Sequence, residues 1–465
     1  MVGFQNVGFR QQSASRAAGG LQPGGSAASS RPVSGLGPYA PLLRLALGFG
    51  AVAGFGYGLT VLLALAFRLP LGGAWLALVQ VHGQAQLVGF VTPFIVAVGG
   101  ILFPRFLASP LDRPATLLVG TVALVGGVAL RVVGQPLGDS PLRVTLLLAS
   151  GVFGPVGLGL AAYPLIRCSR RSIQPWSLWR SYSAFALAAF AGATLLHVYA
   201  SVLLAGGQSL VPFALGEALL HLQLWGFVVP VTLAVGLKIF PNFLILRAPR
   251  ERTFHPLLAL YRAGVALTTA GWLGTELFPS ADDIPVVLRA VGTVFEAAAL
   301  GGFAAAIRLF EPAARPSGTP HITNPTRRWI RLAFAWLLLG ALLGAAYAVR
   351  EALGGAGAGF VGGSVVRHAL AMGYLLPLMA SMAGRILPVY SADVLGHPWL
   401  LPTTVWLLLA GALARVGGEL VGGYEPGVAP IVALGGVLST IGFLLLAGAL
   451  WWSTTRLPAS GTRRA

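Results

Sequence analysis

The sequence predicts an all-α polytopic membrane protein whose twelve transmembrane helices form three pseudo-symmetric repeats of four helices. Composition predicts the membrane location, because 56% of the 465 residues are hydrophobic, only 9% are charged, and the mean hydropathy is +0.80. These values lie far outside the range of soluble globular domains. Uncharged apolar stretches recur along the chain, and each is long enough to cross about 30 Å of hydrocarbon. A motif that occurs three times predicts the repeats.

The repeated motif reads Gly, then Phe or Tyr, two residues, Pro, ten residues and Pro. Its copies begin at Gly89, Gly226 and Gly373. Spans are expected at roughly 40–67, 75–103, 115–134, 143–166, 181–205, 213–240, 256–278, 285–309, 328–349, 362–387, 401–422 and 427–452. The copies therefore fall on spans 2, 6 and 10. Most twelve-span carriers are built from two halves of six spans, so this plan favours a pseudo-threefold ring.

The domain organisation follows from these spans. Residues 1–38 contain no apolar run and are rich in Gly, Ser, Gln and Arg, which is typical of a disordered tail. We expect a single membrane domain over 39–455, with repeats at roughly 39–167, 178–310 and 327–455. A short tail, 456–465, follows it.

The distribution of charge predicts the orientation in the membrane. The net charge is +18, and the arginines gather in the short loops after spans 2, 4, 6 and 8. The positive-inside rule then predicts cytoplasmic tails at both termini. Arginines in short loops between spans argue against a nucleic-acid partner. The single cysteine, Cys168, excludes a disulfide framework and any Cys-x-x-Cys metal or heme-attachment motif.

Four histidines are expected within the membrane at a similar depth. His82, His221 and His368 lie on spans 2, 6 and 10, roughly 10–13 Å from the outer surface at 1.5 Å per residue, and His197 on span 5 lies at a similar depth. Ionisable residues inside a span are costly and are functional candidates by default, and imidazole is the commonest metal ligand. Hydrogen bonding between helices is the alternative, and it is strongest for His197. The remaining histidines are expected to be solvated: His255, His321 and His397.

The histidines break the repeat symmetry. His221 and His368 each lie five residues before the repeat glycine, but that position in the first copy is Gln84, and His82 lies seven residues before. Two residues rotate the face of a helix by about 200°. His82 should therefore face a different gap between helices. Spans 2 and 10 could then approach one pocket from opposite sides, as a heme with two histidine ligands requires.

Charged residues near this layer are further candidates. Arg367 adjoins His368, and Arg415, Arg350 and Arg131 lie near the outer ends of spans 11, 9 and 3. Arginine forks suit the carboxylates of heme propionates, whereas snorkelling at the interface is the alternative for each.

Two glutamates could assist the histidines. Glu217 lies four residues before His221 and could orient its imidazole. Glu296, deep in span 8, could serve a proton path or pair with an arginine of another helix.

Three stretches carry a family resemblance. Segment 82–90, His-Gly-Gln-Ala-Gln-Leu-Val-Gly-Phe, resembles the His-x-His-x-Gln-Leu-x-Gly-Phe motif of NnrS-like proteins. Segment 221–227 resembles the family's sixth-span motif, and Arg-His-Ala-Leu at 367–370, followed by Gly373 and Arg-Ile-Leu-Pro at 385–388, resembles its tenth-span motif. The resemblance covers all twelve spans in layout. NnrS-like proteins are related in turn to the catalytic subunit I of heme–copper oxidases, whose twelve helices form three arcs of four.

The resemblance implies heme b, with copper as a possible second metal, in the inner (plasma) membrane of a bacterium or archaeon. It implies a role in nitric oxide handling or respiratory electron transfer, with nitric oxide or oxygen as the diatomic ligand and an electron-transfer partner that the sequence does not identify. By analogy with subunit I, His82 and His368 are the axial ligands. His221 and His197 are the candidates for a second metal, and Arg367 and Arg415 are those for the propionates.

The chain also departs from the family pattern. Gln84 replaces the family's second histidine in span 2, span 7 lacks the two adjacent copper-binding histidines of oxidases, and span 10 has one histidine where oxidases need two. A complete three-histidine copper site is therefore not expected. The missing ligands disfavour a terminal oxidase or nitric oxide reductase catalytic subunit. The four-helix repeat disfavours a metal-free transporter, the third alternative, and whether the protein is an enzyme stays open.

Overall fold

The computed structural model describes residues 37–455 except 71, 248, 279–282, 313–323, 358 and 392–398. Most of the predicted N-terminal tail and all of segment 456–465 lie outside the described residues, as do His321 and His397.

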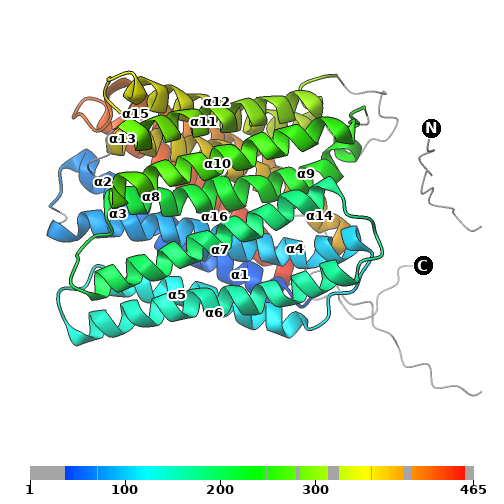
Figure 1. Cartoon of the computed structure of the whole chain (residues 1–465), viewed down its shortest axis with the longest axis horizontal. Coiled ribbons are helices and arrows are strands. Elements are labelled where there is room, and N and C mark those ends of the chain that lie inside the picture. Colours follow the sequence, from blue (N-terminus) through cyan, green and yellow to red (C-terminus); the bar gives the residue numbers. More distant parts are fainter. Residues whose placement is uncertain are drawn as a thin grey trace, which may run out of the picture. The chain divides into compact units, whose positions relative to one another are not determined.

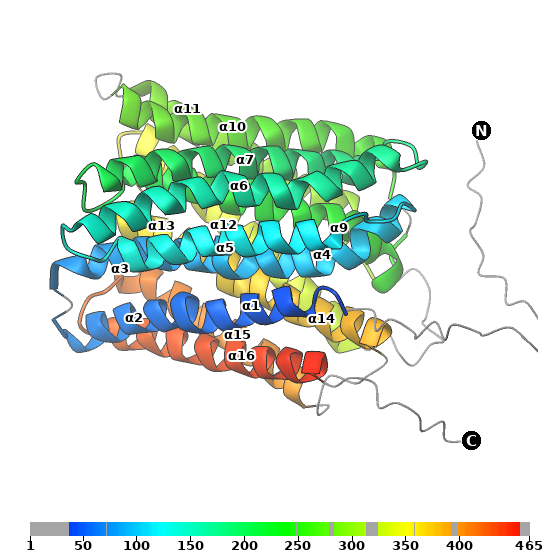
Figure 2. The same ribbon diagram turned by 90° about the horizontal axis from the view of Figure 1, so that it is seen from below.

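The described residues form twelve long helical segments, as predicted (Figures 1 and 2). The first repeat contains α1 (Ala40–Phe49), η1 (Gly50–Gly56) and α2 (Tyr57–Phe67); η2 (Gly72–Ala74), α3 (Trp75–Gln84), η3 (Ala85–Val91) and α4 (Thr92–Leu107); α5 (Pro114–Gly134); and α6 (Pro141–Arg171). The second contains α7 (Leu178–Ala205); α8 (Phe213–His221), η4 (Leu222–Val228) and α9 (Val229–Phe243); η5 (Glu251–Thr253) and α10 (Phe254–Leu277); and α11 (Asp283–Ala306). The third contains α12 (Asn324–Ala352); α13 (Gly359–His368), η6 (Ala369–Leu375) and α14 (Leu376–Ser391); α15 (Leu400–Gly422); and α16 (Ala429–Thr455).

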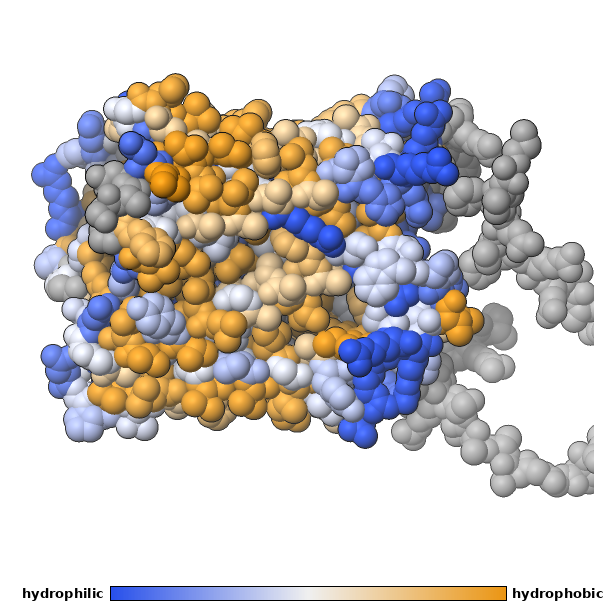
Figure 3. All heavy atoms as spheres, in the orientation of Figure 1, coloured by the Kyte–Doolittle hydropathy of each residue, from blue (hydrophilic) through white to orange (hydrophobic). Residues whose placement is uncertain are grey.

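Eleven of these segments are long and apolar enough to span a membrane. The twelfth, α10, contains Arg262 and Glu276 and is rich in threonine. Figure 3 shows an apolar band between two polar ends of the helical region. The chain is a multi-pass integral membrane protein.

The three motif copies produce the same local structure. Each repeat glycine lies inside a π-helical turn, η3, η4 or η6, and the first proline of each motif is the second residue of the α-helix that follows. A proline four residues after the glycine has no N–H to donate to the glycine carbonyl, and its ring would crowd that carbonyl in a regular α-helix. The wider π turn relieves this conflict. The motif is thus a device that distorts each central helix at the same point.

A side chain from the first helix of the same repeat also packs directly against each repeat glycine. A Cβ atom on Gly89 would lie 2.3 Å from the ring of Phe49, and one on Gly373 would lie 2.4 Å from the ring of Trp336. The second copy differs only in using a small partner, the Cβ of Ala189 at 2.7 Å from Gly226. Glycine is therefore required by close helix packing.

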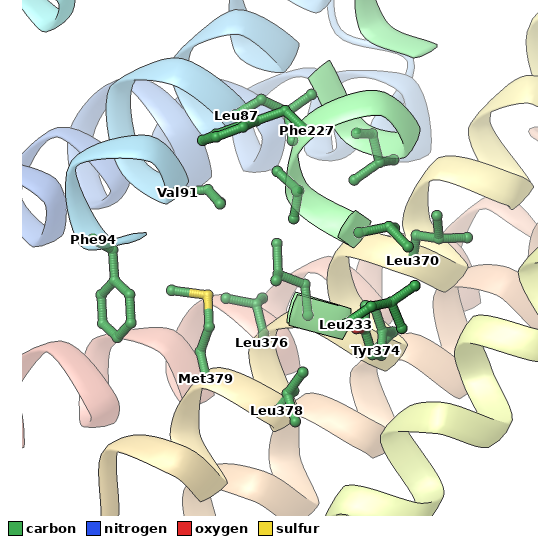
Figure 4. Packing of buried hydrophobic residues seen from close by; sticks show 14 of the residues in the cluster. Leu87, Val91, Phe94, Phe227, Leu233, Leu370, Tyr374, Leu376, Leu378 and Met379 are labelled. Atoms are coloured by element: carbon green, nitrogen blue, oxygen red, sulfur yellow. The ribbon is translucent and has the colours of Figure 1, made fainter. Parts of the chain in front are cut away.

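The central helices meet along equivalent positions. Leu102, Ile239 and Ile386 form one buried apolar cluster, and each lies thirteen residues after its repeat glycine. Nearer the π turns, Figure 4 shows Val91, Phe227 and Met379, one from each of the three central segments, around the same region. Spans 2, 6 and 10 therefore form the centre of the helical arrangement, as a threefold repeat requires.

The third and fourth helices of each repeat cross at a pair of glycines, which the sequence analysis did not identify. The pairs are Gly120 with Gly157, Gly264 with Gly292 and Gly411 with Gly435. In every pair, a Cβ on either glycine would lie 2.7–2.8 Å from the carbonyl oxygen of the other. The two backbones are thus in direct contact three times over.

Gly157→Ala should destabilise the protein by about 1–3 kcal/mol, the usual cost of overpacking. Its Cβ would lie 2.4 Å from the backbone nitrogen of Leu124, which cannot move away as a side chain can. Gly159→Ala on the same helix is the matched control, because nothing lies within 4 Å of a Cβ there. Thermal unfolding of both variants in detergent checks this, and equal unfolding temperatures would contradict the backbone crossing.

Candidate functional site

The structure brings His82 of α3 and His368 of α13 to one cavity of about 780 Å³. Most of its wall is apolar and includes Phe55, Phe90 and Met372. Its volume is within the ~300–1,000 Å³ typical of small-molecule sites. We call it the histidine cavity.

The ring of His82 is held from the first helix. Its Nδ1 lies 2.7 Å from the carbonyl oxygen of Gly54 in η1. A carbonyl can only accept, so Nδ1 carries the hydrogen and, in the neutral ring, the lone pair is on Nε2. Gly58 gives the ring its space, because a Cβ there would lie 2.5 Å from the His82 Cε1.

His368 is held in the same way by its own helix. Its Nδ1 lies 2.8 Å from the carbonyl oxygen of Ser364 and 3.0 Å from the Ser364 hydroxyl. The lone pair of the neutral ring is therefore again on Nε2. The side chain is 22% exposed, so it has a free side toward the cavity. Metal-ligating histidines commonly donate their second ring nitrogen to a backbone carbonyl in this manner.

Gln84 explains why the first copy departs from the repeat. Its side-chain amide forms two reciprocal hydrogen bonds, of 3.1 and 3.0 Å, with the amide of Gln223 in η4. Both side chains are buried, and the pair links spans 2 and 6. The position that holds histidine in the other copies is used here to connect two central helices.

Arg415 is the buried cation of the histidine cavity. It is 4% exposed, and its Nη2 donates to Glu419 at 2.8 Å and to the Tyr424 hydroxyl at 2.9 Å. Its Nε and Nη1, and Oε2 of Glu419, have no hydrogen-bond partner among the described residues. Burial raises the pKa of Tyr424 to about 12, so its hydroxyl stays protonated and donates to Glu419 at 2.5 Å. The two buried donors Nε and Nη1 of Arg415 are thus available beside the cavity.

Arg367 also lines the cavity, but Glu217 already neutralises it. Its Nη1 lies 2.6 Å from both carboxylate oxygens of Glu217. The expectation that Glu217 orients His221 is therefore wrong: the nearer partner of that histidine is on another helix.

His221 pairs with Glu296 of α11. Its Nε2 lies 2.9 Å from the Glu296 Oε1, and the side chains are 8% and 2% exposed. Glu296 therefore pairs with a histidine and not with an arginine. The pair offers one nitrogen ligand and one oxygen ligand to a metal ion. A second metal at His221 stays a prediction.

His197 belongs to a different buried network. Arg131 donates from Nη1 to the His197 Nδ1 at 3.3 Å, and the His197 Nε2 donates to the Ser150 hydroxyl at 3.0 Å. Both ring nitrogens thus have protein partners, and Arg131 faces His197 and Gln135 rather than the histidine cavity. Arg350, the remaining arginine candidate, is exposed.

Sequence reasoning missed Glu419 and Tyr424. The spacing of Arg415 and Glu419, four residues apart on one helix, is a visible signal for an ion pair. Within the described ranges, no group of three or more His, Cys, Asp or Glu side chains is close enough to hold a metal ion.

The fold defines the class: an all-α multi-pass membrane protein with the fold of heme–copper oxidase subunit I. A solved structure of a heme–copper terminal oxidase dimer aligns with 90% of this chain and 84% of its own chain, with a TM-score of 0.66 and 13% sequence identity. At this identity the similarity establishes the fold alone. No protein-family model and no curated protein matches the sequence.

Proposed function

We propose that this protein binds heme b between His82 and His368 and handles nitric oxide or electrons in the membrane, as the resemblance to NnrS-like proteins implies. The observation that supports this best is that both histidines line one cavity while each Nδ1 lies against a backbone carbonyl. Both Nε2 atoms then have lone pairs available for iron. When bound, the heme would supply one-electron redox chemistry, and a diatomic ligand would reach its iron only by replacing one of the two histidines.

The residues of the histidine cavity fit such a group. Largely apolar walls suit the porphyrin face, and neutral imidazoles suit its iron. Nε and Nη1 of Arg415, which have no partner in the described part of the chain, could donate to a propionate, whereas Arg367 would have to share its charge with Glu217.

The protein's own residues would set the properties of the site. The carbonyls of Gly54 and Ser364 fix the tautomer and the orientation of both rings. The carboxylates of Glu217 and Glu419 limit the net positive charge of the two arginines. A site of this kind favours electron transfer or ligand handling over oxygen reduction, for which three histidines around copper would be needed.

The visible spectrum of the full-length protein tests the proposal. We expect protein purified from heme-sufficient cells to show a Soret band and heme b in a ratio near one per chain. Copper analysis of the same sample reports on the second metal. Absence of a Soret band in folded, monodisperse protein would refute heme binding, and turnover of oxygen with a reduced donor would favour the oxidase alternative.

A further inference from the structure

A second large cavity lies outside the histidine cavity. It has a volume of about 470 Å³ and an almost entirely apolar wall, including Val98, Leu158, Leu187 and Met379. These residues come from four spans, on α4, α6, α7 and α14. We call it the apolar cavity.

The apolar cavity has the length of one leaflet of a bilayer. It extends along α7 from Trp179 to Phe190, a rise of about 17 Å at 1.5 Å per residue. Half of the hydrocarbon core measures about 15 Å. An extended acyl chain therefore fits the cavity in length and polarity.

One end of the cavity is cationic. Arg170, Trp176, Trp179 and Arg180 line it where α6 connects to α7. Arg180 is 7% exposed, and its Nη1 and Nη2 donate to the carbonyl oxygens of Gln174 and Ser169 at 2.9 and 2.7 Å, whereas its Nε has no partner among the described residues. Its guanidinium lies over the Trp176 ring, 4.6 Å from the centroid. A buried, incompletely satisfied cation at the mouth of an apolar cavity points to an anionic ligand.

A third cation lies beside this mouth. Lys238 is the single lysine of the chain, and its Nζ lies over the ring of Trp179 at 5.7 Å from the centroid. It is exposed on α9, within a membrane-spanning segment, where a lysine is costly. Its ammonium thus lies over one wall residue of the cavity.

Neighbouring arginines show that acidic partners are available at this end. Arg167 and Arg171 on α6 both pair with Asp112. In contrast, no carboxylate of the described residues pairs with Arg170, Arg180 or Lys238. Three positive charges around the mouth therefore lack a carboxylate among the described residues, although Arg180 also donates to Gln174 and Ser169.

We propose that the apolar cavity holds one acyl chain of an anionic phospholipid, with its phosphate held by Lys238, Arg170 and Arg180. The tryptophans lie where the glycerol backbone would be, as aromatic residues do at membrane interfaces. Basic pockets between transmembrane helices are known to bind lipid phosphates of this kind. The proposal is independent of heme.

The single lysine gives a direct test. Full-length protein is depleted of lipid in detergent and treated with an amine-reactive reagent, and labelling of Lys238 is followed by peptide mass spectrometry. Phosphatidylglycerol should slow labelling at least fivefold relative to phosphatidylcholine with identical acyl chains. Native mass spectrometry should show one retained phosphatidylglycerol, bound about fivefold more weakly for each charge removed by Arg170→Gln or Lys238→Gln.

Arg171→Gln is the matched control, because Arg171 lies on the same helix end but pairs with Asp112. It should retain the lipid, and Lys238→Arg should restore the affinity that Lys238→Gln loses. Equal protection by both lipids, or none, would show that Lys238 only snorkels to the interface. Retention of a neutral isoprenoid quinone in place of the phospholipid would also overturn the proposal.

Discussion

Replacing His82 and His368 together by alanine is expected to abolish heme binding and the Soret band. The two Nε2 atoms are the only ring nitrogens of these side chains not engaged by a backbone carbonyl, so no ligand to iron would remain from this pair. The measurement is heme content per purified chain, with gel filtration and circular dichroism to establish folding.

Single substitutions make the test sharper. His82→Ala and His368→Ala each leave one imidazole, so heme should be retained with a changed spectrum, and added imidazole should restore the original spectrum. His255→Ala is the matched control, because His255 is exposed at the start of α10. Full heme content in the double variant would contradict the assignment of His82 and His368 as the residues that would hold the heme.

The fold could be predicted from the sequence because two of its determinants are local. Apolar length defines each helix, and a motif at fixed spacing, anchored at Gly89, Gly226 and Gly373, defines the repeat. The predicted spans agree with the helices within a few residues at most ends. The three π turns of the motif, η3, η4 and η6, were not predicted as such, although the proline four residues after each glycine contains the reason for them.

The site was predicted less completely, because its contacts join distant helices. Glu296 and His221 are 75 residues apart, and Glu217 and Arg367 are 150 apart, so no local spacing reports either pair. The glycine crossings do leave a local signal, because Gly120 recurs at Gly127 and Gly134, seven residues apart on the face of α5 that contacts α6. That spacing does not identify the partner helix, which includes Gly157. Lys238 was overlooked because the sequence interpretation concentrated on the depth in the membrane shared by the four histidines His82, His197, His221 and His368. Lys238 lies outside that depth.

Glu296→Ala is expected to destabilise the protein by about 3 kcal/mol, the lower part of the range for breaking a buried pair by removing one partner. It would leave His221 Nε2 without its acceptor at a site where both side chains are less than 9% exposed. It would also remove a side chain that packs against Gly264 in the helix crossing. Thermal unfolding in detergent measures the loss, and Glu425→Ala, at an exposed position, is the control.

Glu296→Gln separates a hydrogen bond from a charge or a metal at this pair. The glutamine has the same shape, and its carbonyl oxygen can still accept from the His221 Nε2–H. If the pair is a neutral hydrogen bond, the loss should be below about 1 kcal/mol. If His221 is protonated, or if both side chains hold a metal, glutamine should cost nearly as much as alanine, because an amide neither balances an imidazolium nor replaces a carboxylate ligand.

Copper content then distinguishes these two cases, because only a metal site would lose copper in Glu296→Gln while retaining the heme. An undiminished unfolding temperature in Glu296→Ala would contradict any structural role for the pair.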